Sequence, residues 1–385
     1  MRIRLGLICA LAGMLPAMAQ HSGKALSRQE AKEMKEKLVA EWKKERAATY
    51  RDVAATRVIK AGDRKMMIWS HTFGEEPLDG RSLYISMHGG GGAPKEVNDQ
   101  QWGNQCNLYR PAEGVYVCPR APQDAWDMWH QSMLDTLLHN TIEYFTLTEH
   151  VNPNKVYLMG YSAGGDGVWR LAPRMADSWA AASMMAGHPG ETSLLSLRNL
   201  PYSIWCGGDD AAYDRNVLNY MCGQELDSLR KDDPHGYLHE THIMEGMGHW
   251  MMQADTVAVS WMSQYVRNPY PDRIVWAQGA VPHHAFYWVS VPPADYKEYT
   301  ELRVERRGNT ITILESDYPE VTLWLNDEMV NLDKKVKVVY KGKVLWKGKV
   351  PRTEANLRES LWNRGDAWYA FPGKITIIPA DPPTP

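Results

Sequence analysis

The sequence predicts an α/β domain with a mostly parallel sheet flanked by helices, followed by a smaller all-β domain of sandwich type. Between residues 56 and 267, strand-like and helix-like segments alternate, which is typical of a parallel sheet covered on both faces. After the proline-rich stretch 268–271, short apolar runs separated by turn residues replace the helices. We divide the 385 residues into a leader (1–19), a helical segment (20–55), the α/β domain (56–268) and the β domain (269–385).

The leader has the features of a secretory signal peptide. Arg2 and Arg4 precede an apolar run that is too short to span a membrane, and an A-x-A cleavage site ends at Ala19. We therefore expect an exported protein, periplasmic or secreted. Cleavage removes two arginines and takes the formal charge from −3 to −5, which argues against a nucleic-acid partner. The remaining cysteines could form disulfides or stay as buried thiols: Cys106, Cys118, Cys206 and Cys222.

The segment after the leader is predicted to be one long charged helix. Ser27 and Glu30 fit a capping box that opens a helix to about Tyr50. Its apolar residues recur every four positions and form a narrow stripe. Because the stripe is too short for a coiled coil, we expect the helix to lie across the surface of the main domain.

Apolar periodicity places the individual elements of the two domains. In the α/β domain we expect strands at 82–87, 115–118, 156–159, 201–206 and 237–244, and helices at 134–148, 214–230 and 254–266. In the β domain we expect short strands at 273–276, 286–291, 301–305, 310–314, 321–325, 336–340, 344–346 and 375–378.

The motif GYSAG at 160–164 marks the strongest candidate for chemistry. It follows the apolar strand 156–159 and precedes a helical pattern. A serine on a sharp turn between strand and helix exposes its hydroxyl above the sheet, and flanking glycines permit the strained turn. Ser162 is therefore a candidate nucleophile, which requires a base, an orienting acid and a site for an oxyanion.

Residues of the right types follow Ser162 in the order acid and then histidine. The acid is expected in a loop directly after a strand, where GGDD ends at Asp210; Asp209 and Asp214 are the alternatives. These aspartates could instead only cap the following helix. The base is expected in the next such loop, GMGHW, where glycines give His249 room to approach Ser162.

A glycine-rich loop at 88–92, with the sequence HGGGG, follows the strand 82–87. Bare backbone there can bring N–H groups close to a carbonyl, so Gly90 or Gly91 is expected to form an oxyanion hole together with the amide of Ala163. Phosphate binding is the less suitable interpretation, because no P-loop Lys-Ser/Thr follows.

These four motifs together, HGGGG, GYSAGG, GGDD and GMGHW, resemble the α/β-hydrolase superfamily over roughly residues 56–267. Within it the chain is most similar to secreted esterases of the polyhydroxybutyrate-depolymerase, feruloyl-esterase and dienelactone-hydrolase-like groups. The resemblance implies an α/β-hydrolase fold and a serine carboxylic-ester hydrolase that works through an acyl-enzyme without a cofactor. In it Ser162 would be the nucleophile, His249 the base and Asp210 the acid.

The aromatic composition bears on the substrate. The chain has 16 Trp and 19 Tyr against 4 Phe, and rings with a polar tip suit a sugar face or an aryl acyl group, although they also fill cores. We expect small-molecule or polysaccharide esters, chiefly carbohydrate-linked acyl or aryl esters. The candidate substrate-binding residues near the loop ends are Trp129, His130, His188 and Trp250.

The sequence also bears on metal binding, on the lysine-rich segment and on competing functions. No metal is expected, because His239 and His242 are three apart in a predicted strand and face opposite sides. The lysines between 334 and 349 could be a solvated, protected sheet edge or a patch for anionic polysaccharide. The competing functions are a serine peptidase of the prolyl-oligopeptidase type and a non-catalytic carbohydrate-binding protein on a hydrolase scaffold.

Overall fold

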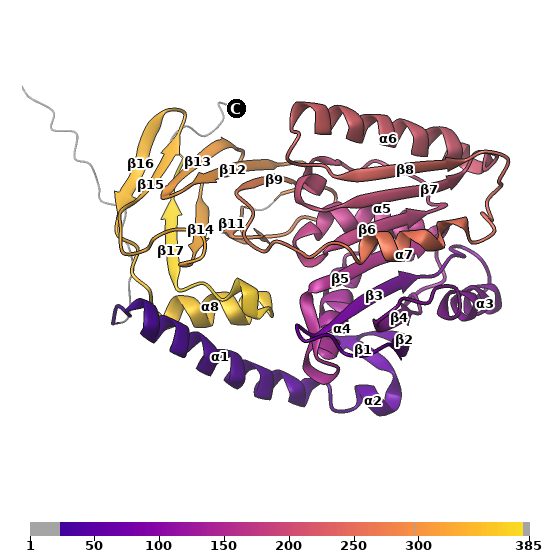
Figure 1. Ribbon diagram of the computed structural model, residues 1–385, viewed down its shortest axis with the longest axis horizontal. Coiled ribbons are helices and arrows are strands. Elements are labelled where there is room, and N and C mark those ends of the chain that lie inside the picture. Colours follow the sequence, from indigo (N-terminus) through magenta and orange to yellow (C-terminus); the bar gives the residue numbers. More distant parts are fainter. Residues whose placement is uncertain (1–23, 296, 380–385) are drawn as a thin grey trace, which may run out of the picture.

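The computed structural model describes residues 24–295 and 297–379 (Figure 1). The predicted leader at 1–19 lies outside these residues. None of the helices in the described part combines the length and the apolar character that crossing a membrane would require.

The first domain is built on one eight-stranded sheet with the strand order β1-β2-β4-β3-β5-β6-β7-β8. The strands β1, β2 and β4 pair antiparallel, and all further pairs are parallel. The predicted α/β-hydrolase fold class is confirmed by this topology. The strands are β1 (Val58–Ala61), β2 (Arg64–Phe73), β3 (Arg81–Met87), β4 (Gly114–Pro119), β5 (Val151–Tyr161), β6 (Ala181–Met185), β7 (Tyr202–Gly207) and β8 (His239–Met244).

Both faces of this sheet are apolar, which is why helices cover both. Alternate side chains of a strand point to opposite faces. On one face Leu83 and Leu158 join a buried cluster that includes residues of α4, α5 and α6, whereas Tyr84 and Tyr157 belong to a cluster with α3 and α7 on the other. The helices are α2 (Val53–Thr56), α3 (Lys95–Cys106), α4 (Met133–Thr148), α5 (Ala163–Arg174), α6 (Arg215–Asp232) and α7 (Val257–Met262).

The second domain contains two sheets whose inner faces share one buried core, as the sandwich prediction requires. The four-stranded sheet has the order β10-β11-β14-β17 and the five-stranded sheet the order β16-β15-β13-β12-β9. The strands are β9 (Arg273–Ala277), β10 (Ala285–Phe286), β11 (Val289–Ser290), β12 (Glu301–Arg307), β13 (Thr310–Ser316), β14 (Val321–Leu325), β15 (Val336–Tyr340), β16 (Lys343–Gly348) and β17 (Gly373–Ile377).

This domain also holds a helix, α8 (Glu354–Arg364), which the strand pattern did not predict. Its start and end have recognisable signals. The side chain of Thr353 accepts a hydrogen bond from the amide of Asn356, and Gly365 follows the helix with a φ of 60°. The remaining described helical segments are short 3-10 helices at Ala176–Ser178, Leu195–Asn199, Ala212–Asp214, Ala254–Thr256 and Ala367–Tyr369.

The long N-terminal helix is α1 (Arg28–Thr49), and its predicted capping box is present. The expectation that it lies across the main domain is only partly met. Its buried residues Leu38 and Trp42 pack with Leu357 and Leu361 of α8, and only its last turns reach α4. Figure 1 shows α1 running beneath α8 toward α4. The helix therefore connects the two domains.

Candidate active site

Ser162 occupies a strained turn between β5 and α5. Its φ of 56° and ψ of −122° lie outside the regions that L-residues favour. Two glycines make the turn possible. A Cβ atom at Gly160 would lie 2.3 Å from the carbonyl oxygen of Gly164, and one at Gly164 would lie 2.0 Å from the carbonyl oxygen of Met87. The close crossing of strand, turn and helix lifts the serine out of the sheet. The turn thus has the strand–turn–helix geometry expected of a nucleophile elbow.

His249 and Asp210 meet Ser162 from two separate loops. The His249 Nε2 atom lies 2.9 Å from Ser162 Oγ, and Nδ1 lies 2.7 Å from Asp210 Oδ2. Because a carboxylate accepts at Nδ1, the ring proton sits on that nitrogen and the Nε2 lone pair faces the serine hydroxyl. The side chain of Asp210 is 2% exposed, so this acceptor is shielded from water.

Of the three aspartates considered for the acid, Asp210 is the one that contacts His249. Neither Asp209 nor Asp214 makes that contact. Asp214 stands at the start of α6, but its side chain forms no capping hydrogen bond. A Cβ atom at Gly207 would lie 2.2 Å from the carbonyl oxygen of Gly248. This close approach of the two loops needs glycine at position 207.

Tyr161 fixes the loop that carries His249. Its hydroxyl donates to the carbonyl oxygen of His249 at 2.7 Å and accepts from the amide of Met251 at 3.1 Å. Burial raises the pKa of Tyr161, so the phenol keeps the proton that it donates. Tyr161 precedes the nucleophile directly, and it therefore ties the serine turn and the histidine loop together.

Another carboxyl group lies beside this constellation. Asp166, in the first turn of α5, accepts a hydrogen bond from the amide of His188 at 2.6 Å. The pKa of Asp166 is raised overall, because its burial outweighs the lowering effect of that hydrogen bond and of the nearby Arg215. The predicted substrate contact His188 is thus held against Asp166, and its ring stands edge-on to Tyr213 at 6.4 Å between centroids.

The glycine-rich loop lies against the elbow. A Cβ atom at Gly89 would come 3.6 Å from Ser162 Oγ, and one at Gly91 would come 3.8 Å from the Cβ of Ala163. Ala163 is the first residue of α5, so its amide has no partner within the helix. The structure therefore places the predicted Gly91 and Ala163 side by side. It also brings Gly89, which the sequence analysis did not select, closest to the serine hydroxyl.

The side chain of Asn98 supports the glycine-rich loop, a role that no sequence motif indicated. Its side-chain amide donates to the carbonyl oxygens of Gly91 and Ala93, each at 3.0 Å. Gly90 has a φ of 118°, and a Cβ atom there would lie 1.9 Å from Asn98 Oδ1. Position 90 therefore tolerates only glycine.

His88 braces the same loop as a neutral ring. Its Nδ1 donates to the carbonyl oxygen of Gly89 at 2.6 Å, and its Nε2 accepts from the amide of Ala121 at 3.1 Å. Burial lowers the pKa of His88 to about 4, which keeps the ring neutral near pH 7. Trp129 Nε1 donates to the carbonyl oxygen of His88 at 2.9 Å.

Comparisons with known proteins add the following. No family model and no curated protein matches the chain. Among solved structures, a thermostable esterase is similar at 14% identity and a TM-score of 0.44, over 55% of this chain and 62% of that one. The ferric enterobactin esterase of Salmonella typhimurium has 11% identity and a TM-score of 0.40, over 54% and 56%. A ferulic acid esterase has 14% identity and a TM-score of 0.32, over 52% of this chain and 99% of that one.

The four predicted substrate contacts fall into different places. Trp129 is fully buried, so the expectation that it touches substrate is contradicted; it supports His88 instead. His130 is partly buried beside Trp126, with 5.4 Å between ring centroids, and does not line the cleft at Ser162. His188 does not line it either. Trp250 does, and it is 48% exposed.

A cleft of about 770 Å³ opens in front of Ser162 and His249. Its described lining contains no Lys, Arg, Asp or Glu. Carboxamides dominate instead, with apolar surface from Val97, Leu108 and Trp250. A neutral carboxamide can both donate to and accept from hydroxyl groups. The carboxamide side chains are those of Gln101, Asn104, Asn107 and Gln253, together with the buried Gln105, whose amide donates to Ser86.

The histidines considered for metal binding in β8 have separate partners. His239 Nε2 lies 3.2 Å from Asp227, and His242 Nε2 lies 3.0 Å from Glu240. Within residues 24–295 and 297–379, no group of three or more His, Cys, Asp or Glu is arranged to hold a metal ion. The four cysteines in these ranges are free thiols.

Proposed function

We propose that this protein is a serine carboxylic-ester hydrolase that works through an acyl-enzyme. The observation that supports this most is the continuous contact from Ser162 through His249 to Asp210, at 2.9 and 2.7 Å. A serine hydroxyl becomes a useful nucleophile only when a base can take its proton, and here the unprotonated ring nitrogen faces it.

The reaction would run in two halves. Ser162 Oγ attacks the ester carbonyl carbon while His249 Nε2 takes the hydroxyl proton, and Asp210 stabilises the resulting imidazolium. Collapse of the tetrahedral intermediate breaks the bond to the alcohol, which leaves with the proton from His249. Water then attacks the acyl-serine by the same route and releases the acid. The amide of Ala163 and the loop Gly89–Gly91 would hold the oxyanion in both halves.

For the substrate we propose neutral, hydroxyl-rich esters, such as acyl or aryl esters of carbohydrates. The cleft offers carboxamide side chains and the exposed face of Trp250, and its described lining has no Lys, Arg, Asp or Glu. Indole faces stack on sugar rings and on aryl acyl groups, while carboxamides can donate to and accept from hydroxyls. A charged substrate would find no counter-charge there.

The proposal is tested by labelling with a fluorophosphonate, which reacts with activated serines. We expect the label on Ser162 in the wild type and none in Ser162→Ala. Turnover of nitrophenyl acetate should fall by about 10⁶ in that variant. Ser260→Ala is the matched control, because Ser260 is exposed and bonds only locally. Intact labelling of Ser162→Ala would refute the assignment.

The substrate class is tested by a release assay on acetylated, feruloylated and methyl-esterified polysaccharides, read by mass spectrometry. We expect release of acid from a neutral sugar ester. Faster cleavage of a dipeptide nitroanilide than of nitrophenyl acetate would instead indicate a peptidase. Sugar binding without any ester turnover would indicate a non-catalytic protein.

We also propose that the protein is exported. The proposal rests on the leader sequence, with Arg2 and Arg4 ahead of an apolar run and a cleavage site at Ala19. N-terminal sequencing of the protein from producing cells should begin at Gln20. A retained Met1 on active protein would contradict it.

A further inference from the structure

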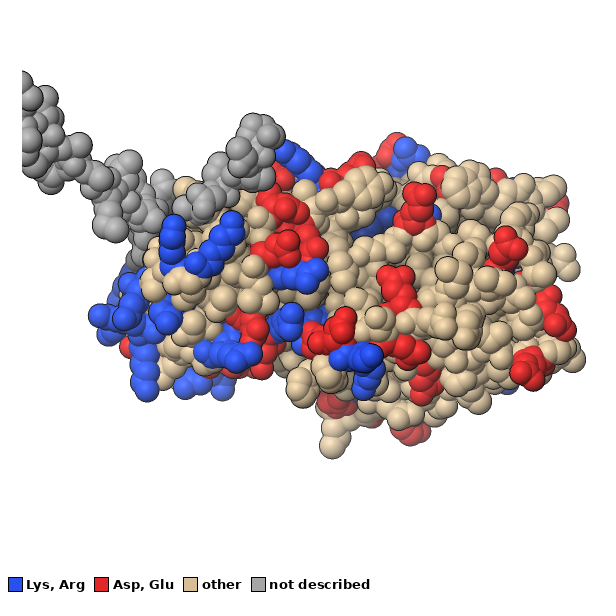
Figure 2. All heavy atoms as spheres, turned by 90° about the horizontal axis from the view of Figure 1, so that it is seen from above, with Lys and Arg blue, Asp and Glu red and all other residues tan. Residues whose placement is uncertain are grey.

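The hairpin of β15 and β16 carries a concentration of positive charge that the proposed ester chemistry does not use. Residues 334–349 contain seven lysines and no Asp or Glu. Since the whole chain has a formal charge of −3, the other residues together carry −10. Figure 2 shows Lys and Arg gathered at the end of the molecule formed by the β domain. The molecule is therefore strongly polarised.

Four of these lysines share one face of the hairpin. Lys337 of β15 stands directly opposite Lys347 of β16. Lys335 and Lys349 flank the neighbouring pair Val336 and Gly348, so they continue the same register. Side chains two residues apart point to the same side, and Val336 and Val338 are fully buried, so the lysines point outward. We call Lys335, Lys337, Lys347 and Lys349 the lysine face.

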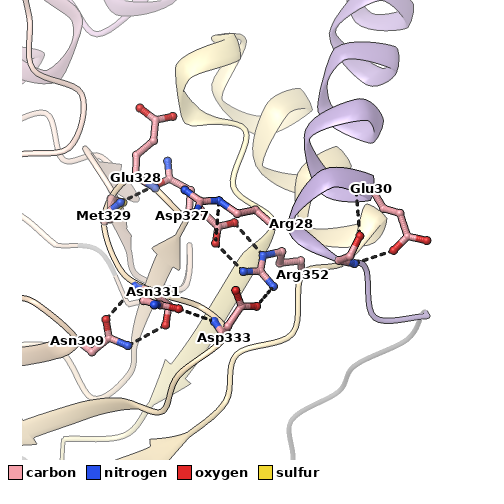
Figure 3. A network of polar contacts seen from close by, with 11 residues as sticks. Arg28, Glu30, Asn309, Asp327, Glu328, Met329, Asn331, Asp333 and Arg352 are labelled. Carbon is pink, nitrogen blue, oxygen red and sulfur yellow. Dashed lines mark hydrogen bonds and ion pairs between the residues drawn. The ribbon is translucent and has the colours of Figure 1, made fainter.

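In the described part of the chain, no acidic residue forms an ion pair with the lysine face, although acids lie nearby. Figure 3 shows that Asp327 and Asp333 are held by Arg352 instead. The hydrogen bond from Arg352 lowers the pKa of Asp333, and the nearby charge of Lys349 lowers it further. Of the face, Lys349 alone is near enough to Asp333 to affect its pKa, so most of the positive charge has no close acidic partner among the described residues.

Protection of a sheet edge explains only part of this pattern. Strand β16 is the edge of its sheet, and lysines on an edge discourage pairing with other chains. Lys337, however, lies on β15, which is paired on both sides by β13 and β16. Like charges directly opposite each other destabilise a sheet. Lys337 therefore costs stability opposite Lys347 without itself standing on an edge strand.

We propose that the lysine face binds a linear anionic polysaccharide, with carboxylate or sulfate groups along its chain. The cations repeat about 5 Å apart across the strands and about 7 Å apart along them, which suits a repeating polyanion. The row from Lys347 to Lys337 continues in register to Thr310 and then Arg307, across β13 and β12. The proposed binding surface thus runs across the five-stranded sheet and ends at Arg307, which is also paired with Glu305.

The experiment measures binding of the full-length protein to polygalacturonate, with starch as the neutral comparison. The face variant replaces Lys335, Lys337, Lys347 and Lys349 by Gln. The matched control replaces Lys32, Lys44, Lys60 and Lys65 by Gln, which gives the same change in charge; Lys60 and Lys65 also face each other on a hairpin. We expect about tenfold or greater loss of affinity in the face variant alone, and weaker wild-type binding at higher salt.

Each outcome separates this inference from the proposed esterase activity. Turnover of nitrophenyl acetate should be the same in both lysine variants, and Ser162→Ala should bind polygalacturonate like the wild type. An equal loss in the face and control variants would show an effect of net charge and overturn the proposal. Absence of binding, or tighter binding to phosphatidylglycerol vesicles than to polygalacturonate, would also overturn it.

Discussion

At the residue scale, the candidate site depends on protonation states that burial sets. His88 is neutral because burial lowers its pKa, and this lets it donate to Gly89 and accept from Ala121 at once. A charged ring would have a proton on both nitrogens, and the acceptor at Nε2 would be lost. The loop that carries the expected oxyanion donors is therefore sensitive to acid.

The pH dependence of stability should show this. The pKa of His88 falls from 6.5 to about 4 on folding, so the unfolded chain binds the extra proton between these values. The contribution of His88 to the free energy of unfolding is therefore complete above about pH 6.5. It falls by on the order of 3 kcal/mol as the pH is lowered toward 4. In denaturant titrations, the free energy of unfolding of His88→Gln should fall less between pH 7 and pH 5 than that of the wild type. The exposed control His71→Gln should follow the wild type.

The choice of acid is tested by replacing single aspartates. Asp210→Asn removes the carboxylate that holds the proton on His249 Nδ1, and comparable changes in other triads cost about 10⁴ in turnover. Asp209→Asn should leave turnover of nitrophenyl acetate within a few-fold of the wild type. A larger loss in Asp209→Asn than in Asp210→Asn would contradict the assignment.

At the element scale, the site is assembled by close crossings of backbone. The start of α5 passes so near the end of β3 that Gly164 has no room for a side chain, because its Cβ would meet the Met87 carbonyl at 2.0 Å. Gly207 has the same function where the backbone of the Asp210 loop meets the carbonyl of Gly248, while a Cβ at Gly90 would meet the side chain of Asn98. The spacing of elements, rather than any one polar contact, sets the position of Ser162.

Two helical glycines allow a matched test. Gly164→Ala forces α5 away from β3, and we expect a loss of about 1–3 kcal/mol in the free energy of unfolding together with a loss of turnover. Gly103 in α3 has open space around it, so Gly103→Ala should stabilise by about 0.5–1 kcal/mol. Denaturant titration measures both. Equal effects at the two positions would refute the crowding argument.

At the scale of the whole molecule, buried ionic contacts join the two domains. Arg267 donates to the Asn154 carboxamide of the first domain at 2.7 Å and to Asp366 of the second at 2.6 Å. Asp177, in a 3-10 helix of the first domain, accepts from Arg364 and from the amide of Tyr287. We therefore expect the domains to unfold together.

Removing Arg267 tests this connection. Its side chain is 4% exposed, and Arg267→Ala leaves the buried carboxylate of Asp366 without its arginine partner, with the amide of Trp368 still donating to it. We expect a cost of about 3–5 kcal/mol and, in calorimetry, a single transition that splits or moves to lower temperature. Arg307→Ala should change stability by less than about 0.5 kcal/mol, because that side chain is 86% exposed. Two separate transitions already present in the wild type would contradict the coupling.

The parts that the sequence analysis missed have physical reasons. The strand β2 was not predicted because only Met66 and Ile68 of it are buried, and a strand whose other side chains are exposed or half-exposed has little apolar pattern. The expected strand at 286–291 is two short strands, separated at Tyr287, whose φ is 49°. The helix expected at 254–266 is shorter, because α7 covers only Val257–Met262. The helix α8 was missed among strand signals, although Thr353 and Gly365 mark its ends.

The sequence by itself determined the alternation of strands and helices, the motifs at the strand ends and their order, because these follow from local periodicity and turn chemistry. The tertiary structure decided which aspartate reaches His249, that Gly89 lies nearest Ser162, and that Trp129 is buried beneath the site. It also showed that Lys337 faces Lys347. These facts depend on which distant segments come into contact, and the packing of separate elements sets those contacts, not the local pattern of any one of them.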